Sequence, residues 1–212
     1  MTGRLVLREA RRGLVGGAWL PVAFFLLVAT IVPFAVGPDA RLLARIGGGA
    51  LWIAALTAAM LPIERLIEPD RADGVLDQLA LAGSAEEAVG AAKMIGHWIT
   101  FGPLLLVAAV PGSFLVGLDG AALLRSLVSL AIGTPALAAL AVSVAALTAG
   151  LPRAGALAGL LMMPLAVPLV IFGAAATGDG ESSALKLEAA VALLLVAGSP
   201  FVTGAAIRAG RT

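Results

Sequence analysis

Most of the chemistry that this chain could do is concentrated in residues 64–93, which lie between two long apolar runs. Seven of the chain's thirteen acidic residues fall within this segment, together with three basic ones. The acids are Glu64, Glu68, Asp70, Asp73, Asp77, Glu86 and Glu87, and the bases are Arg65, Arg71 and Lys93. In an otherwise apolar chain, such a concentration predicts a segment that is presented to a soluble partner. The alternative is an ordinary solvated connection between two helices.

The patterns of several enzyme classes are missing from the sequence. There is no G-x-x-x-x-G-K-[ST] loop, so we expect the chain to hold no ATP in a P-loop of its own. Neither H-E-x-x-H nor G-x-S-x-G occurs, and the absence of cysteine excludes thiol catalysis, disulfides and cysteine-bound metal. We therefore expect no catalytic residue, no metal site and no tightly held cofactor. Energy, if the protein uses any, must come from another subunit.

The only histidine, His97, is followed by Trp98 and lies about one turn into an apolar run. A histidine could bind haem iron or another metal. A lone histidine beside a tryptophan at the end of a span is more often an anchor at the membrane interface. We favour the anchor and keep a haem contact at His97 as the alternative.

Arg41 and Arg45 form a second candidate site. They are four residues apart, which places them on one face of a helix. The pair could receive an anion such as a carboxylate, or it could simply flank a membrane span.

The rest of the chain consists largely of uncharged apolar runs, and 60% of all residues are hydrophobic. Ordinary soluble domains do not have this composition. Six runs reach the roughly 18 residues that suffice to cross a bilayer. They cover residues 18–36, 46–63, 94–118, 126–152, 154–178 and 189–207. We predict an all-α membrane protein with six transmembrane helices in one permease domain, residues 1–212, that contacts the lipid bilayer and binds no nucleic acid.

Ionisable residues are absent from the centres of these runs, and Glu188 falls in the polar connection before the last one. A proton- or ion-coupled transporter usually buries such a residue within a span. The pattern therefore argues against that class of transporter.

The distribution of basic residues predicts the orientation in the membrane. With the N-terminus in the cytoplasm, ten of the fourteen lysines and arginines lie inside and four lie outside. This N-in/C-in arrangement places residues 64–93 in the cytoplasm and the Arg41–Arg45 pair outside.

Residues 3–15 have the pattern of a helix that lies on the membrane surface. The basic side chains fall within one arc of about 100°, and apolar side chains lie opposite. These basic residues are Arg4, Arg8, Arg11 and Arg12. We predict an interfacial helix, for which the alternative is a positively charged flank of the first span.

Turn and capping signals within residues 64–93 predict a short helix between two helical stalks. Pro69 would interrupt the helix that leaves the second span. Asp73 would cap the short helix, and Gly83 would end it. Its apolar residues share one face at Val75, Leu76, Leu79 and Ala80. We expect Leu76 to be exposed in the isolated chain, where a partner could bind it.

A capping box follows the short helix. Ser84 would be the N-cap, and Glu87 would reach back from the third position of the next helix. This pattern predicts that the helix of the third span begins near Ala85.

Several motifs, in order along the chain, resemble the haem exporter B permease of the cytochrome c maturation ABC transporter, an ABC-2-like membrane component. They are Gly37-Pro-Asp-Ala-Arg-Leu-Leu-Ala-Arg45, Trp52-Ile-Ala-Ala-Leu56, Glu64-Arg-Leu66, Asp73-Gly-Val-Leu-Asp-Gln-Leu79, Lys93-Met-Ile-Gly-His-Trp98, Gly133-Thr-Pro135 and Gly150-Leu-Pro-Arg-Ala-Gly155. The resemblance extends from about Leu5 to Arg208.

The resemblance implies a set of partners and a ligand. Two copies of the chain would pair with two copies of a cytoplasmic ATPase subunit. A haem-handling membrane subunit, a small single-span subunit and a periplasmic haem chaperone would complete the system. Haem would be transported or handled by the complex, or the ATPase would drive release of the haem-loaded chaperone.

This resemblance makes the short helix of residues 64–93 a coupling helix for the ATPase. The residues that we expect to couple are Glu64, Arg65, Asp73, Gly74, Leu76, Asp77 and Leu79. Two rival functions are a membrane scaffold that transports nothing, and a secondary transporter that works alone with an ion gradient.

Overall fold

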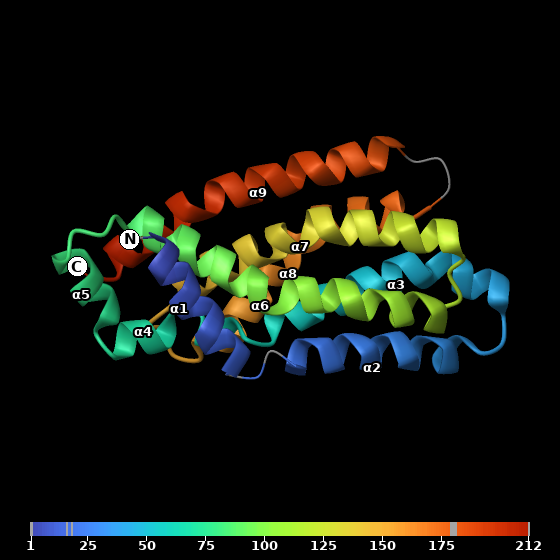
Figure 1. Ribbon diagram of the computed structural model, residues 1–212, viewed down its shortest axis with the longest axis horizontal. Helices are drawn as coiled ribbons and strands as arrows, with labels where there is room; N and C mark the ends of the chain where they lie inside the picture. The colour runs from blue at the N-terminus through green and yellow to red at the C-terminus, as the bar shows by residue number, and fades with distance from the viewer. Residues whose placement is uncertain (1, 16, 18, 179–181, 212) are drawn as a thin grey trace.

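The computed structural model describes residues 2–15, 17, 19–178 and 182–211, and these residues form an elongated bundle of helices (Figure 1). Six of the helices are long and apolar enough to cross a membrane. They are α2 (Trp19–Val36), α3 (Ala40–Met60), α6 (Glu86–Leu115), α7 (Gly120–Thr148), α8 (Ala154–Ala176) and α9 (Ser182–Ala209). The described residues contain no strand. The prediction of an all-α protein with six spans is therefore confirmed, while its orientation in the membrane stays a prediction.

The shorter elements gather at one end of the bundle. They are α1 (Thr2–Val15), the 3-10 helix η1 (Ile63–Arg65), α4 (Glu68–Ala72) and α5 (Val75–Leu81). Both chain termini lie at the same end, on the left of Figure 1. We call it the terminal end, and we call the opposite end, where α2 turns into α3, the far end.

Helix α7 forms the centre of the bundle because it packs against α3, α6, α8 and α9. In its most apolar stretch 78% of the residues are buried, whereas only 17% are buried in the corresponding stretch of α2. Alanine dominates residues 136–142, all of which are buried. Small side chains let neighbouring helix backbones approach closely. Such close packing stabilises helix association in a membrane, where lipid tails are as apolar as the side chains and the hydrophobic effect does not drive helices together.

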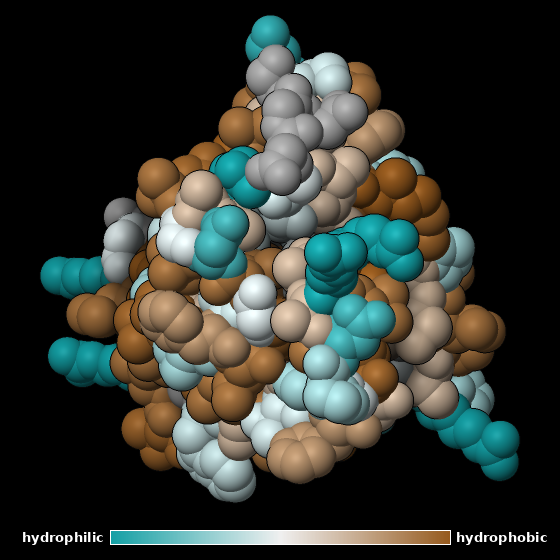
Figure 2. Space-filling view, turned by 90° about the vertical axis from the view of Figure 1, so that its right-hand side faces the viewer, coloured by the Kyte–Doolittle hydropathy of each residue, from teal (hydrophilic) through white to brown (hydrophobic). Residues whose placement is uncertain are grey.

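The outer surface of the bundle carries large apolar side chains that face away from the core. Leu27, Ile31 and Phe34 of α2 are 51%, 53% and 85% exposed. Figure 2, which looks onto the far end, shows brown hydrophobic residues around the sides of the bundle and hydrophilic residues scattered over the end itself. This surface suits a lipid environment.

Trp52 of α3 fixes the spacing of three helices in the far half of the bundle. The side chain is fully buried. A Cβ atom at Gly133 of α7 or at Gly173 of α8 would lie 2.0 or 2.1 Å from the indole ring. Both positions therefore need glycine, because any side chain would displace the ring.

Candidate coupling surface at the terminal end

The charged segment, residues 64–93, forms the terminal end of the bundle, and its path differs from the predicted one. Helix α3 ends at Met60, before Pro62, and η1 follows. Pro69 lies in the first turn of α4, where proline is well tolerated because its missing N–H has no helical partner to lose. The predicted interruption at Pro69 was therefore wrong, since the long helix has already ended.

Asp73 does not cap α5, contrary to the prediction. It is the residue at the end of α4, and its backbone N–H bonds the carbonyl of Pro69. Gly74 follows in the left-handed conformation, with φ of 69°, and precedes α5 without any side-chain cap. The left-handed turn separates Asp73 from the start of α5, which is why its carboxylate cannot reach the first N–H groups.

Gly83 ends α5 as predicted. It adopts φ of +74°, and its N–H bonds the carbonyl of Ala80, while the N–H of Ser84 bonds the carbonyl of Leu79. These two bonds define a Schellman motif.

The predicted capping box after this turn is wrong, although α6 begins at Glu86, one residue from the predicted start. Ala85 holds the extended N-cap position, so the helix begins one residue later than the box requires. The Ser84 hydroxyl is buried and has no partner among the described residues. Glu87 pairs with Arg208 of α9 instead of reaching back.

Leu76 is buried, which corrects the expectation that it would be exposed in the isolated chain. It is 5% exposed and belongs to the main hydrophobic core, and Leu79 packs against the same core. The outward face of α5 instead carries Asp77, Gln78 and Leu81, of which Leu81 is 89% exposed. The segment is thus seated on the bundle by the apolar face that we had expected a partner to bind.

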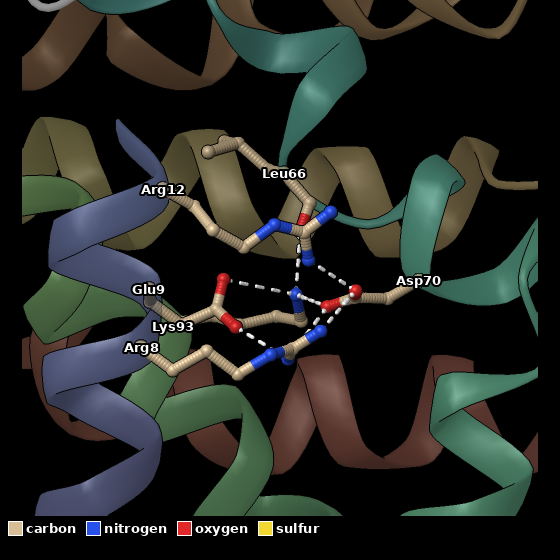
Figure 3. Close-up of polar contacts among 6 residues, drawn as sticks. All are labelled: Arg8, Glu9, Arg12, Leu66, Asp70 and Lys93. Carbon is tan, nitrogen blue, oxygen red and sulfur yellow. Dashed lines mark hydrogen bonds and ion pairs between the residues drawn. The ribbon is translucent and has the colours of Figure 1, made fainter. Parts of the chain in front are cut away.

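Asp70 of α4 is the centre of an ion-pair cluster that the sequence did not reveal (Figure 3). Its carboxylate accepts hydrogen bonds from Arg8 and Arg12 of α1 and from Lys93 of α6. Only 1% of Asp70 and 3% of Lys93 is exposed. The hydrogen bond to Asp70 also holds the pKa of Arg12 above its ordinary value.

Lys93 uses all three of its N–H donors within this cluster. Besides Asp70, its ammonium group bonds Glu9 of α1 at 3.3 Å and the backbone carbonyl of Leu66 at 2.8 Å. Arg8 completes the ring by bonding Glu9 at 2.9 Å. We call the five charged residues Arg8, Glu9, Arg12, Asp70 and Lys93 the Asp70 cluster. It joins α1, α4 and α6 through a buried Asp70–Lys93 pair, while Arg8 and Arg12 remain 35% and 45% exposed.

A second set of ion pairs joins the segment to the last helix. Arg211 contacts Asp77 at 3.1 Å and Glu86 at 2.7 Å, and Arg208 contacts Glu87. Arg211 also donates to the backbone carbonyl of Leu76 at 2.6 Å. We call Asp77, Glu86, Glu87, Arg208 and Arg211 the α9 cluster.

Most acids of the segment therefore have partners within the chain. Glu68 accepts hydrogen bonds from Arg71 and from the backbone of Gly150. Together with the two clusters, this accounts for the acids Glu68, Asp70, Asp77, Glu86 and Glu87. The sequence signal for the Asp70 cluster was the set of arginines within residues 3–15, which we had interpreted as the basic face of a helix on the membrane surface.

Glu64 and Arg65 lie in η1, at the joint between α3 and the short helices. A Cβ atom at Gly155 of α8 would lie 1.7 Å from the Glu64 carboxylate, so Glu64 rests directly on the α8 backbone. Arg65 lines a cavity of about 280 Å³ beneath α1, together with Arg12 and Lys93.

His97 also lines this cavity, and it lies inside the protein rather than at an interface. Its side chain is 5% exposed, its ring centroid is 4.7 Å from that of Phe101, and its Nε2 has no partner among the described residues. Trp98 donates to Thr134 of α7 at 3.1 Å. The preferred interpretation of His97 as an interface anchor was therefore wrong, whereas for the half-buried Trp98 it stays a prediction. The volume of the cavity lies at the lower edge of the roughly 300–1,000 Å³ of ligand pockets, and a haem contact at His97 stays a prediction.

Arg41 and Arg45 lie at the far end, away from the other candidate residues. Both are exposed on the first turns of α3, which Asp39 caps. Arg45 borders a groove between α2 and α3 whose other lining residues are apolar. No contact in the described residues assigns these arginines a ligand, and an anion contact stays a prediction.

The fold and this end of the molecule define a class of protein: a six-span membrane protein with a compact, charged surface at one end. Within that class, the family model described as "CcmB protein" matches residues 4–210. The chain is 46% identical to "Heme exporter protein B" of Rhodobacter capsulatus and 44% identical to that of Paracoccus denitrificans, over 91% of each chain. It is 41% identical to the protein of the same name from Escherichia coli K12, over 89% of this chain and 88% of the relative.

These matches cover nearly the whole chain at well above 30% identity, and the chain therefore belongs to the CcmB family. Its relatives are bacterial, and it has six helices that can span a bilayer. It is a multi-pass protein of the bacterial inner membrane.

Proposed function

We propose that this chain is the membrane-spanning subunit of an ATP-driven complex that exports haem, or releases a haem-loaded chaperone, during cytochrome c maturation. The relatives named "Heme exporter protein B" support the haem-related role. The sequence contains no P-loop, which favours ATP hydrolysis by a separate subunit. Two copies of the chain would work with two ATPase subunits, a haem-handling membrane subunit, a small single-span subunit and the periplasmic chaperone.

In this proposal the terminal end faces the cytoplasm and the ATPase binds the outward face of α5. That face combines an exposed leucine, Leu81, with the polar side chains of Asp77 and Gln78. An apolar centre with a polar rim is the usual composition of a protein interface. Leu81 therefore takes the role that we had assigned to Leu76.

The observation that carries the proposal is the way α4 and α5 are fastened. The Asp70 cluster ties α4 to α1 and α6, and the α9 cluster ties α5 to α6 and α9. Glu64 in η1 rests on α8. A displacement of α5 by the ATPase would therefore be passed to four helices rather than absorbed by a flexible connection.

Within this mechanism the remaining coupling residues have distinct roles. Glu64 and Arg65 would transmit motion at the joint beneath α3, and Asp73 and Gly74 form the turn that holds α5 at its angle to α4. Leu76 and Leu79 seat α5 on the core. Direct contact with the ATPase would then fall to Asp77 and Leu81.

Replacing Leu81 tests the proposed docking face. Leu81→Asp should abolish co-purification with the ATPase from membranes and leave the protein folded, because the side chain is 89% exposed. Ala85→Asp is the matched control, since Ala85 is also exposed at this end and tolerates a carboxylate at an N-cap. Wild-type yield of the ATPase with Leu81→Asp would exclude α5 as the dock.

Reconstitution separates coupled export from the two rival functions. With the ATPase in liposomes, a spin-label pair on α8 and α9 should change its distance on addition of ATP. A scaffold would bind the ATPase and show no such change. Haem uptake by the chain alone, driven by a proton or sodium gradient, would instead establish a secondary transporter.

A further inference from the structure

Glu188 is a fully buried acid within the last membrane span, although the sequence placed it in a polar connection. It lies on α9, and its exposed fraction is 0%. Oε1 faces α7, where a Cβ atom at Gly133 would be 3.1 Å away. Oε2 lies 2.8 Å from the hydroxyl of Ser129, also on α7. An ionisable residue inside a span is costly and usually functional.

The hydroxyl of Ser129 has three polar neighbours but only one hydrogen. Trp52 Nε1 lies at 2.9 Å and can only donate, while the carbonyl of Gly173 lies at 3.1 Å and can only accept. If Ser129 donates to Gly173, its two lone pairs are left for two donors. One of these donors is Trp52, and the other must be Glu188.

We propose that Glu188 is a proton-binding site: a neutral carboxylic acid whose O–H donates to Ser129. This protonation state is the one that satisfies all three contacts at once. A carboxylate would take the only hydrogen of Ser129 and leave the buried carbonyl of Gly173 without it. The inference does not depend on the proposed haem export or on the ATPase.

The surroundings of Glu188 support a neutral group. Among the described residues, none with a positive charge forms an ion pair with it. Its second oxygen, Oε1, has no hydrogen-bond partner there either. A buried carboxylate in this place would have no counter-charge to offset the free-energy cost of its burial. The cost of leaving the carbonyl oxygen of a neutral acid without a hydrogen bond is far smaller.

The protonated acid is a positioning residue, because it joins four helices through one hydroxyl. Trp52 belongs to α3, Ser129 to α7, Gly173 to α8 and Glu188 to α9. Loss of the proton would break the link to α8 and place a charge where α9 packs against α7 and α8. Helix α9 also carries Arg208 at the terminal end, and Arg211 lies in the turn that follows it, so the position of α9 matters at both ends of the bundle.

Infrared spectroscopy of the purified full chain in lipid nanodiscs tests the protonation state. At neutral pH the wild type should show the C=O stretching band of an un-ionised carboxylic acid, and Glu188→Gln should lose it. Glu68→Gln is the matched control, because Glu68 pairs with Arg71 and should contribute no such band. Ser129→Ala should shift the band of Glu188 in frequency, a change that a merely structural role would not produce.

Uniform ¹³C labelling of glutamate keeps the test decisive if Glu188→Gln fails to fold. The band should move to lower frequency in the labelled wild type and should also respond to Ser129→Ala. Absence of any glutamate carboxylic acid band at neutral pH would overturn the proposal. A labelled band that is unchanged in both Glu188→Gln and Ser129→Ala would belong to another residue. This result would also overturn the proposal.

Discussion

Two buried carboxyl groups at opposite ends of this bundle are accommodated in different ways. Asp70, at the terminal end, is 1% exposed and is surrounded by Arg8, Arg12 and Lys93. Glu188, in the far half, is fully buried with hydroxyl, indole and backbone neighbours instead of cations. In the first case opposite charges offset the cost of burial, and in the second the cost is avoided by retaining a proton.

The difference follows from what each site must join. Asp70 connects helices near the edge of the bundle, where arginine stems reach it from partly exposed positions and their charged groups stay close to water. Around Glu188 the helices are packed too closely for such side chains, since Gly133 and Gly173 leave room only for Trp52. A neutral acid is the polar group that fits there without a counter-charge.

Removing the Asp70 carboxylate should have the largest effect on stability. Asp70→Ala would leave Lys93 buried without its main counter-charge, which typically costs about 3–5 kcal/mol. Thermal unfolding of the detergent-solubilised protein should show the loss as a large decrease in Tm or as failure to accumulate. Asp73→Ala, at an exposed residue of the same segment, should change stability by no more than about 0.5 kcal/mol.

Neutral isosteres should separate the two carboxyl groups. Asp70→Asn removes a charge on which three cations depend, so its cost should approach that of Asp70→Ala. Glu188→Gln replaces one neutral donor by another and should stay within about 1 kcal/mol of the wild type, the net value of one hydrogen bond. Equal decreases in Tm for the two variants would show that both acids are charged. This result would contradict the contrast between a charged Asp70 and a neutral Glu188.

The six spans could be predicted from the sequence because each is an uncharged run of sufficient length, and hydropathy depends on local composition alone. The same holds for Gly83, whose place after an amphipathic stretch marks a helix end. The resemblance of short ordered motifs was enough to identify the family that the comparison confirmed.

The ion pairs could not be predicted, because they join residues that are far apart in the sequence. Arg8 lies 62 positions from Asp70, and Arg211 lies 125 positions from Glu86. The apolar face of α5 fitted a partner and the core equally well, and only the tertiary structure shows that Leu76 belongs to the core. Glu188 was assigned to a connection because the uncharged apolar run began one residue after it, while α9 in fact begins at Ser182.

The α9 cluster should respond to salt more strongly than the buried pair of Asp70 and Lys93. The side chain of Arg208 is 48% exposed, whereas those of Asp70 and Lys93 are 2% and 3% exposed. Salt screens exposed charges far more than buried ones. Arg208→Ala should therefore lower Tm slightly at low ionic strength and not at all at high ionic strength, whereas the decrease caused by Asp70→Ala should persist. A salt-independent effect of Arg208→Ala would mean that the α9 cluster is effectively buried.

His97 extends the comparison to a buried ionisable side chain that is not an acid, and its replacement should have the smallest effect. No acidic side chain among the described residues forms an ion pair with it, and its Nε2 has no partner there. His97→Gln keeps a neutral polar group of similar size beside Phe101 and avoids the cavity that alanine would leave. We expect normal protein level, normal binding of the ATPase and nearly unchanged cytochrome c maturation in cells that carry this variant. Complete loss of maturation at normal protein level and normal ATPase binding would show instead that His97 contacts haem, and the small cavity beneath α1 would then have to open to admit it.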